Sequence, residues 1–281
     1  MTVPEVLPFT FGMEVEYNGG SCDCCEGRGE VCCYECEGDG EVECGSCGHI
    51  ESCETCYGSG EMECGECDGE GSGGSTSYAP PGWDVKPEHC GTEYVSPPMR
   101  DVSQAMAQLR RLASNYSSFE VDNCGFHIHL SINPNDPVAV DPVRFFHRWQ
   151  ELKEQRIYPL VPKGVAERHY TQWCMLVGPD TTFQDWQRSF QRYQEINPVS
   201  VSAHGTLEVR LGGSSADGEE LCRFLEAVLE LANECRYRNA DPMARIRYLQ
   251  GWAPSDSPLG QYAAHHHRRI VRQRRAAMQA A

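Results

Sequence analysis

The stretch Phe11-Gly12-Met13-Glu14-Val15-Glu16-Tyr17 predicts a β-strand with two chemically different faces. Successive side chains of a strand point to opposite faces, so Glu14 and Glu16 share one face while Met13 and Val15 share the other. The apolar face is typical of a strand that packs on a core. Two carboxylates on the opposite face are unusual, because a solvent-facing strand usually carries Thr, Lys or Ser there.

Three later segments have the same character. They are Gly91–Pro98 with Glu93, Cys124–Leu130 with His127 and His129, and Gly205–Leu211 with Glu208 and Arg210. If these strands are neighbours, one sheet face gathers four carboxylates, two imidazoles and a guanidinium. Burying like charges together costs several kcal/mol, and a divalent cation removes that cost. Carboxylate-rich sets favour Mg²⁺ or Mn²⁺. The alternative is that the four strands are unrelated and face solvent.

A cysteine block interrupts this pattern between Cys22 and Cys67 and holds twelve of the 17 cysteines. The repeat C-x-x-C-x-G-x-G occurs four times, and a fifth pair lacks both glycines. The pairs are Cys22–Cys25, Cys33–Cys36, Cys53–Cys56 and Cys64–Cys67, with Cys44–Cys47 as the fifth. Two such pairs supply the four thiolates of a tetrahedral zinc site. The block has few large apolar residues, so we expect metal binding to supply its folding free energy. A redox-active or disulfide-stapled loop is the alternative.

The block resembles the cysteine-rich zinc domain of DnaJ-type co-chaperones. The resemblance implies that the first repeat shares a zinc ion with the fourth, and the second with the third. The two ligand sets would be Cys22, Cys25, Cys64 and Cys67, and Cys33, Cys36, Cys53 and Cys56. A fifth pair, with Cys44 and Cys47, and twelve thiols leave room for three four-thiolate sites, so we expect two or three Zn²⁺ ions.

The flanking motifs F-G-M-E-V-E, G-T-E-Y-V-S-P-P-M, C-G-F-H-I-H-L and G-T-L-E-V-R resemble the ordered motifs of the amidoligase family, which is related to glutamate–cysteine ligase and glutamine synthetase. The resemblance spans residues 9–17 and roughly 83–235. It also covers Arg168-His169-Tyr170 and Arg192-Tyr193 with Asn197. It implies an ATP-dependent carboxylate–amine ligase that forms an amide through an acyl phosphate. The implied fold is a curved antiparallel sheet with helices on one face.

The resemblance also implies roles for particular side chains. Mg²⁺ (or Mn²⁺) and ATP would be held by a set of six residues, namely Glu14, Glu16, Glu93, His129, Glu208 and Arg168. The catalytic residues would be Arg210, Arg192 and His127. Two other functions stay open. One is a metal-dependent hydrolase that uses the H-x-H pair, and the other is a zinc-stabilised interaction module on a degenerate ligase scaffold.

Apolar residues at helical spacing predict three helices, and with the strands they predict an α+β fold. The helices are Asp101–Phe119, Thr182–Ile196 and Asp217–Arg238. We expect a catalytic domain from residues 1–18 and 78–256, with a small irregular zinc-stapled β-hairpin insertion at 19–77. A basic C-terminal helix or tail covers 257–281, where we expect the run His265–His267 to lie on a solvated helix face.

Charge is distributed unevenly along the chain. Residues 1–72 hold 18 acidic residues and one basic residue, Arg28, while the remaining 23 acidic and 23 basic residues cancel. An acidic block repels phosphate backbones, so a nucleic-acid contact could come only from the basic tail. We expect carboxylate and amine substrates of small-molecule or peptide type, and a protein partner at the zinc block. No apolar run of 18 residues and no leader pattern occur, so we expect a cytoplasmic protein without a membrane span.

Overall fold

The computed structural model describes residues 3–18, 20–21, 24, 28, 30–43, 46–65, 72–73, 79–88, 91–116, 121, 124–161, 174–189 and 191–280. The chain forms two compact units. The first contains Met1–Tyr17, Ala79–Lys86 and Glu93–Ala281, and the second contains Asn18–Tyr78 and Pro87–Thr92. The chain thus leaves the first unit after the strand that carries Glu14 and Glu16, returns to it for Ala79–Lys86, and rejoins it for good at Glu93.

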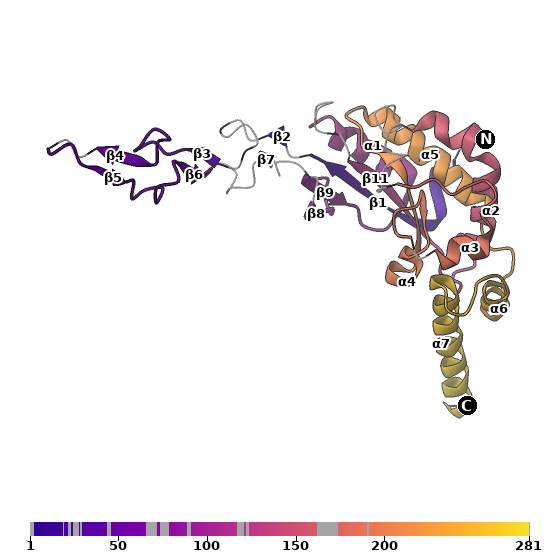
Figure 1. The fold of residues 1–281 in the computed structure, drawn as a ribbon. Helices are drawn as coiled ribbons and strands as arrows, with labels where there is room; N and C mark the ends of the chain where they lie inside the picture. The colour runs from indigo at the N-terminus through magenta and orange to yellow at the C-terminus, as the bar shows by residue number, and fades with distance from the viewer. Residues whose placement is uncertain are drawn as a thin grey trace. The chain divides into compact units, whose positions relative to one another are not determined.

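The first unit is built on a mostly antiparallel sheet (Figure 1). The described strands follow the order β12 (Ile196–Asn197), β13 (Thr206–Gly213), β11 (Gly125–Ser131), β1 (Val6–Tyr17), β9 (Gly91–Val95) and β8 (Asp84–Glu88), and β10 (Met99–Asp101) also pairs with β1. The pairs β1–β11, β11–β13, β12–β13 and β1–β10 are antiparallel. With the helices packed on this sheet, the prediction of an α+β fold is confirmed.

One face of the sheet is a hydrophobic core. Phe11, Met13 and Val15 of β1 are at most 2% exposed, and so are the apolar residues of β11 and β13. Helices α1 (Val102–Ala113) and α5 (Gly218–Glu234) pack together and contact β1 and β11 from this side. The Phe224 ring of α5 meets the Phe126 ring of β11 edge-on, with centroids 6.0 Å apart. The period-2 alternation therefore separates an apolar core face from a polar face.

Aspartate caps start the helices that surround this core. The side chains of Asp101, Asp141, Asp217 and Asp241 accept backbone N–H groups in the first turns of α1, α2 (Pro142–Leu152), α5 and α6 (Pro242–Trp252). Proline follows Asp141 and Asp241 at the first helical position, where its missing N–H has no cost. The remaining helical segments are η2 (Lys153–Ile157), η3 (Tyr158–Leu160), α3 (Phe183–Arg188), α4 (Ser200–His204) and α7 (Pro258–Ala280).

All three predicted helices end earlier than expected. The helix predicted over Thr182–Ile196 ends at Arg188, because Ile196 and Asn197 pair with Val209 and Glu208 as the sheet strand β12. The helix predicted over Asp217–Arg238 ends at Glu234, because Arg236 forms a bridge with Val140. The predicted helix over Asp101–Phe119 is α1, which ends at Ala113; its last predicted residues, 117–119, lie outside the described residues. Strand pairing thus overrides the helical spacing of the apolar residues.

Helices α4 and α7 border the polar face of the sheet instead of the core face. Helix α4 contacts β13, and α7 contacts α3, α4 and α6. His266 of α7 is only 7% exposed and bonds to Asn135, while His265 is exposed. The expectation that His265–His267 lies on a solvated helix face is therefore wrong for His266. None of the described helices combines the length and apolar character that a membrane span requires.

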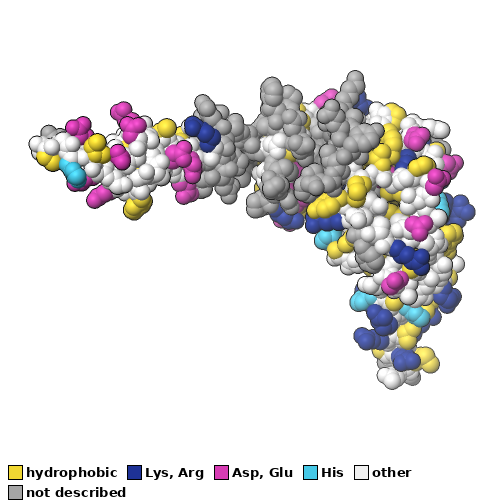
Figure 2. All heavy atoms as spheres, in the orientation of Figure 1, with side chains coloured by type: hydrophobic (Ala, Val, Ile, Leu, Met, Phe, Trp, Pro, Cys, Tyr) yellow, Lys and Arg dark blue, Asp and Glu magenta, His cyan; other side chains and the backbone are white. Residues whose placement is uncertain are grey.

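The second unit contains three nested antiparallel strand pairs. They are β2 (Gly20–Ser21) with β7 (Ser72–Gly73), β3 (Glu30–Cys32) with β6 (Glu61–Glu63), and β4 (Glu41–Glu43) with β5 (Ile50–Ser52). A C-x-x-C turn separates β3 from β4, and a second one separates β5 from β6. Figure 2 shows acidic side chains along this unit. Such short strands bury little apolar surface, so another interaction must stabilise them.

Candidate functional site

Strand register brings the polar side chains together on the sheet face opposite the core. Glu14 of β1 lies directly across from His127 of β11, and His129 lies across from Glu208 of β13. On the far side of β13, Asn197 of β12 lies across from the same Glu208. Because directly opposed residues on one face have Cβ atoms about 5 Å apart, this register places neighbouring polar groups in contact.

His127 lies at the centre of the cluster and is 2% exposed. Its Nδ1 is 3.3 Å from a Glu14 oxygen and 3.8 Å from a Glu208 oxygen, and its Nε2 is 3.8 Å from a Glu16 oxygen. Two sets of ligand atoms, each within 4.8 Å of one another, could hold a metal ion. They are Glu14 with His127 and Glu208, and Glu16 with Glu93 and His127. The two sets share His127.

Two donors fix the Glu208 carboxylate. Arg210 Nη1 lies 2.5 Å from one oxygen, and Asn197 Nδ2 donates to the other at 2.6 Å. His129 is oriented from both sides of its ring, with Nε2 3.1 Å from a Glu14 oxygen and Nδ1 3.0 Å from the Thr206 hydroxyl. These contacts hold the carboxylates and imidazoles in defined positions.

The cluster buries several carboxylates close together. Glu16, Glu93 and Glu208 are at most 9% exposed, and Glu14 is partly buried. Arg210 pairs with Glu208, and the half-exposed Lys86 lies 3.8 Å from Glu93. Burying a carboxylate costs several kcal/mol unless a cation balances its charge. Oxygen-rich ligand sets with one imidazole fit Mg²⁺ or Mn²⁺, so the residues present suit a hard divalent cation.

The local field keeps the key carboxylates ionised. Burial acts to raise the pKa of Glu14, but hydrogen bonds and positive charge from His127 and His129 outweigh it and hold the pKa far below its usual range. Burial also opposes ionisation of Glu208, but Arg210 and the two histidines lower its pKa on balance. Burial would lower the pKa of His129, yet Glu14 raises it above its ordinary value. Ionised carboxylates are the form that binds metal.

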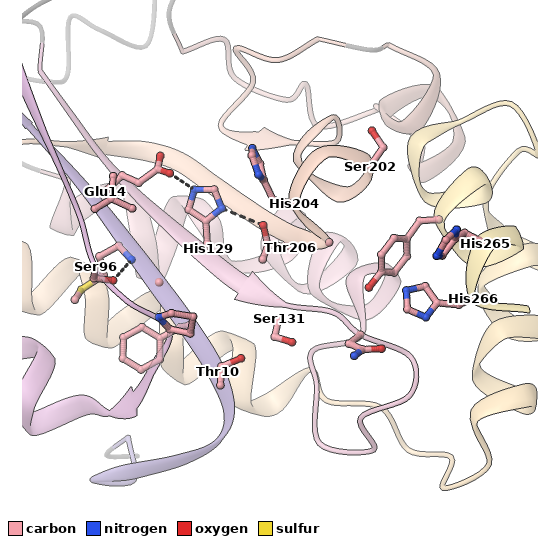
Figure 3. Close-up of a pocket in the computed structure, with 18 of the residues that line it drawn as sticks. Thr10, Glu14, Ser96, His129, Ser131, Ser202, His204, Thr206, His265 and His266 are labelled. Atoms are coloured by element: carbon pink, nitrogen blue, oxygen red, sulfur yellow. Dashed lines mark hydrogen bonds and ion pairs between the residues drawn. The ribbon is translucent and has the colours of Figure 1, made fainter. Parts of the chain in front are cut away.

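A cavity of about 780 Å³ adjoins Glu14 and His129. Figure 3 shows these two residues at one end and His265 and His266 of α7 at the other, with Ser131 and Thr206 between them. His204 of α4 also lines it, and its ring lies 6.1 Å from that of His129. The described lining contains no Lys or Arg, and Glu14 is its one carboxylate. The cavity therefore suits a polar molecule that is neutral or positively charged.

The predicted arginines are placed differently from one another. Arg210 lies within the cluster, while Arg192 is exposed. Both guanidinium groups lie 5.6 Å from the ring centroid of Tyr193, so one aromatic ring connects Arg192 to the cluster. Arg168 lies outside the described residues.

Four cysteines of the second unit form a second candidate metal site. The ligand sulfurs of Cys33, Cys36, Cys53 and Cys56 lie within 4.8 Å of one another, and all four side chains are buried. Sulfur atoms are 3.8 Å apart between Cys33 and Cys53 and 3.6 Å apart between Cys36 and Cys56. Tetrahedral Zn–S bonds of about 2.3 Å place the sulfurs about 3.8 Å apart. The cluster thus has the dimensions of a four-thiolate zinc site.

The backbone around this cluster repeats itself in the two halves. Gly40 N–H donates to Cys36 Sγ at 3.3 Å, and Gly60 N–H donates to Cys56 Sγ at 3.2 Å. Cys33 N–H donates to Gly60 O and Cys53 N–H to Gly40 O, both at 2.8 Å. Burial opposes ionisation of Cys56, but the Gly60 N–H and neighbouring thiols lower its pKa to about 6. The Gly60 N–H thus favours the thiolate form of Cys56, which is the form that binds zinc.

Of the other predicted thiol ligands, the structure describes Cys47 and Cys64. Cys47 is exposed and Cys64 is buried. Cys22, Cys25, Cys44 and Cys67 lie outside the described residues, so the predicted pairing of the first repeat with the fourth stays a prediction. No family model matches this chain, and no curated protein matches it.

Some residues of the sites were not singled out from the sequence. Lys86 and His204 belong to none of the motifs, and Thr206 belongs to the motif G-T-L-E-V-R without being singled out; their roles depend on strands and helices that meet only in the folded chain. The position of Thr206 relative to Glu208 could have indicated that its hydroxyl lies on the polar face. It lies two residues before Glu208 on β13 and therefore on the same face.

Proposed function

We propose that the protein is an ATP- and Mg²⁺-dependent ligase, on a glutamine synthetase-like fold, that forms an amide bond between a carboxylate and an amine through an acyl phosphate. The observation that carries the proposal is the gathering of Glu14, Glu16, Glu93 and Glu208 around His127 on one sheet face. Phosphoryl transfer to a carboxylate depends on positioning and charge neutralisation more than on covalent help from the protein. A buried group of ionised carboxylates suits the divalent ions that such a reaction needs.

Each group of residues has a part in this proposal. Glu14, Glu16, Glu93 and Glu208 would hold Mg²⁺, which neutralises charge on phosphoryl oxygens when bound. Arg210, already fixed against Glu208, would stabilise negative charge on the transferred group. Arg192 shares the Tyr193 ring with Arg210 and would act from the solvent side.

The cavity beside Glu14 and His129 would receive the amine substrate. Its described lining lacks the Lys and Arg side chains that a phosphate-binding surface uses. Hydroxyl groups of Ser131 and Thr206 and the imidazole of His204 can instead bond to a polar amine. Glu14 supplies the one negative charge that would attract an ammonium group to this end of the sheet.

The acidic second unit would recruit a protein or peptide substrate. Its described segments 30–43 and 46–65 contain ten acidic residues and no Lys or Arg. Tyr34, Ile50 and Tyr57 are exposed within the same unit. A basic segment with apolar side chains complements such a surface. Replacing residues 19–77 by a short Gly/Ser loop should therefore change substrate choice, and unchanged choice in that variant would remove the recruitment role.

Calorimetric titration tests the ligase itself. The wild-type protein should bind Mn²⁺ and ATP·Mg²⁺, and it should release phosphate from ATP only when a pool of candidate carboxylates and amines is present. Glu14→Gln should weaken Mn²⁺ binding by about tenfold or more, since it removes one ionised ligand. Glu226→Gln on α5 makes the same chemical change away from the cluster and should leave binding unaltered.

The outcomes separate three classes of function. A ligase binds ATP·Mg²⁺ and couples its turnover to an amine. A hydrolase that uses His127 and His129 ignores ATP, and a degenerate scaffold binds ATP without turnover. Equal Mn²⁺ binding by wild type and Glu14→Gln would contradict the assignment of the carboxylates.

A further inference from the structure

A second, smaller cavity lies away from the acidic cluster, between the start of α2 and one face of α6. Its volume is about 300 Å³. Asp141 and Arg144 line it from α2, Tyr237, Arg238 and Asn239 line it from the connection between α5 and α6, and Ala244, Arg245 and Tyr248 line it from α6. We call it the arginine pocket, because three of these eight side chains are arginines.

Arg245 is the most informative residue of the arginine pocket. It is 1% exposed, and two of its nitrogens are committed to backbone carbonyls. Nε donates to Pro134 O and Nη1 donates to Asn239 O, both at 2.5 Å. Nη2 is buried and has no hydrogen-bond partner among the described residues. A buried donor of a charged group left without an acceptor is costly, so an acceptor from outside the chain would fill a specific need.

No carboxylate in the described part of the chain forms an ion pair with this guanidinium. Arg144 and Arg238 add two further positive charges to the lining, and Asp141 adds one negative charge. The Asp141 carboxyl already accepts the N–H groups of Val143 and Arg144, and the Tyr248 hydroxyl bonds to it.

Two other acids influence Arg245 but do not line the pocket. Asp136 and Asp241 act on its charge from a distance, and neither forms an ion pair with it in the described part of the chain. Burial is the main influence on Arg245, and it lowers the pKa of the guanidinium. The pocket as a whole is therefore positively charged around a buried donor.

The walls of the arginine pocket set the kind of ligand. Tyr237 lies against Arg245, with 5.8 Å between the guanidinium carbon and the ring centroid, and Tyr248 lines another part of the wall. The volume exceeds that of a bare phosphate ion. We propose that the arginine pocket binds a small organic molecule through a carboxylate or phosphate group, with Arg245 Nη2 as the central donor and the tyrosine rings against the rest of the molecule.

Anion titrations test this site directly on the full-length chain. Inorganic phosphate, benzoate and phenyl phosphate are added to the protein at constant ionic strength, with NaCl as the reference salt. Binding is followed by calorimetry and by the thermal unfolding midpoint, because a ligand that binds the folded state raises that midpoint. We expect saturable binding, with the two aromatic probes tighter than phosphate. Benzoate and phenyl phosphate separate carboxylate from phosphate recognition.

A substitution at Ala244 supplies a matched pair of variants. Ala244→Glu places a carboxylate in the pocket without removing Arg245, whose bonds to Pro134 and Asn239 support the fold. The new carboxylate should accept a hydrogen bond from Arg245 Nη2, and it should therefore weaken binding of the anion probes by about tenfold or more. Ala244→Gln has nearly the same size and no charge, and its affinity should stay within about threefold of wild type.

The binding measurements on wild type and the two Ala244 variants either support or overturn the proposal. Saturable binding that is lost in Ala244→Glu and kept in Ala244→Gln supports the site. No saturable binding to wild type overturns the proposal, and so does equal binding by wild type and Ala244→Glu. None of these readings depends on ATP or on the acidic cluster, so the arginine pocket stands or fails independently of the ligase proposal.

Discussion

The substitution Gly60→Ala, which adds a single methyl group, tests the cysteine cluster most directly. This glycine has φ +78°, a conformation that residues with a Cβ rarely adopt, and a Cβ there would lie 2.2 Å from the carbonyl oxygen of Gly38. The Gly60 backbone also donates to Cys56 Sγ and accepts from Cys33 N–H. Gly60→Ala must therefore shift the backbone at the point where it holds two of the four thiol residues.

The magnitude follows from these contacts. A left-handed conformation costs a residue with a Cβ about 1–2 kcal/mol. Each of the two backbone hydrogen bonds that must distort contributes about 1 kcal/mol. The total is about 2–4 kcal/mol if the strain is added to a loss of half or all of the energy of the two bonds. Because metal binding supplies the folding free energy of such a unit, the loss should appear as zinc affinity weaker by roughly 30-fold to several hundredfold.

Competition with a chromophoric chelator measures this affinity, and metal analysis counts the ions per chain. Gly65→Ala is the matched control, because a Cβ at Gly65 meets nothing within 4 Å and its φ is not in the left-handed region. We expect Gly60→Ala to lose one zinc equivalent at a chelator concentration that Gly65→Ala withstands. Equal zinc retention by the two variants would refute the reasoning.

Three further predictions concern other parts of the molecule. Burial raises the pKa of Asp141 from 3.8 to about 6, so its ionisation should lower the free energy of unfolding by about 3 kcal/mol as the pH rises from about 4 through 6. Asp141→Asn keeps an N-cap and should remove this pH dependence, which urea unfolding followed by tryptophan fluorescence measures. Lys153→Met removes the ammonium group that lies 2.7 Å from the buried carboxylate of Glu195, and it should lower the free energy of unfolding by about 3–5 kcal/mol. The double variant Lys153→Met/Glu195→Gln should recover much of this loss, and equal losses in the single and double variants would argue against the ion pair. In amide hydrogen exchange, chelation of all metals should abolish protection in β3 and β6, while β1 and β11 keep theirs. Loss of protection in all four strands would contradict separate stabilisation of the two units.

Local alternation in the sequence predicted the polar face well. Each of the four motif strands places its acidic or imidazole residues on one face, since apolar residues such as Val15 and Ile128 occupy the other. The cysteine spacing predicted local C-x-x-C turns with their glycines, and the resemblance to the DnaJ-type zinc domain implied the set that comes together, Cys33, Cys36, Cys53 and Cys56.

Features that depend on distant segments were not predictable in the same way. The sequence from Thr182 to Ile196 has helical spacing, but its end joins the sheet because β13 offers an unpaired edge. The arginine pocket forms where the start of α2 meets α6, about a hundred residues later in the chain, and no local pattern around Arg245 marks it. Local propensity cannot include an interaction whose partner is set by the fold.

The two candidate metal sites differ in what assembles them. On the sheet, Met13 and Val15 alternate with Glu14 and Glu16, so the register that buries the apolar side chains also brings the carboxylates opposite His127. A one-residue slip would place the apolar side chains on the polar face, and burial of each is worth about 1.5–3 kcal/mol. Core packing therefore holds the carboxylates together against their repulsion before any ion binds. The cysteine-rich unit has no comparable core, because its described buried cluster is made of the thiols themselves with Val42 and Met62 packed at its side. There the ligands are the core, so metal binding and folding must be one event in the second unit and separate events in the first.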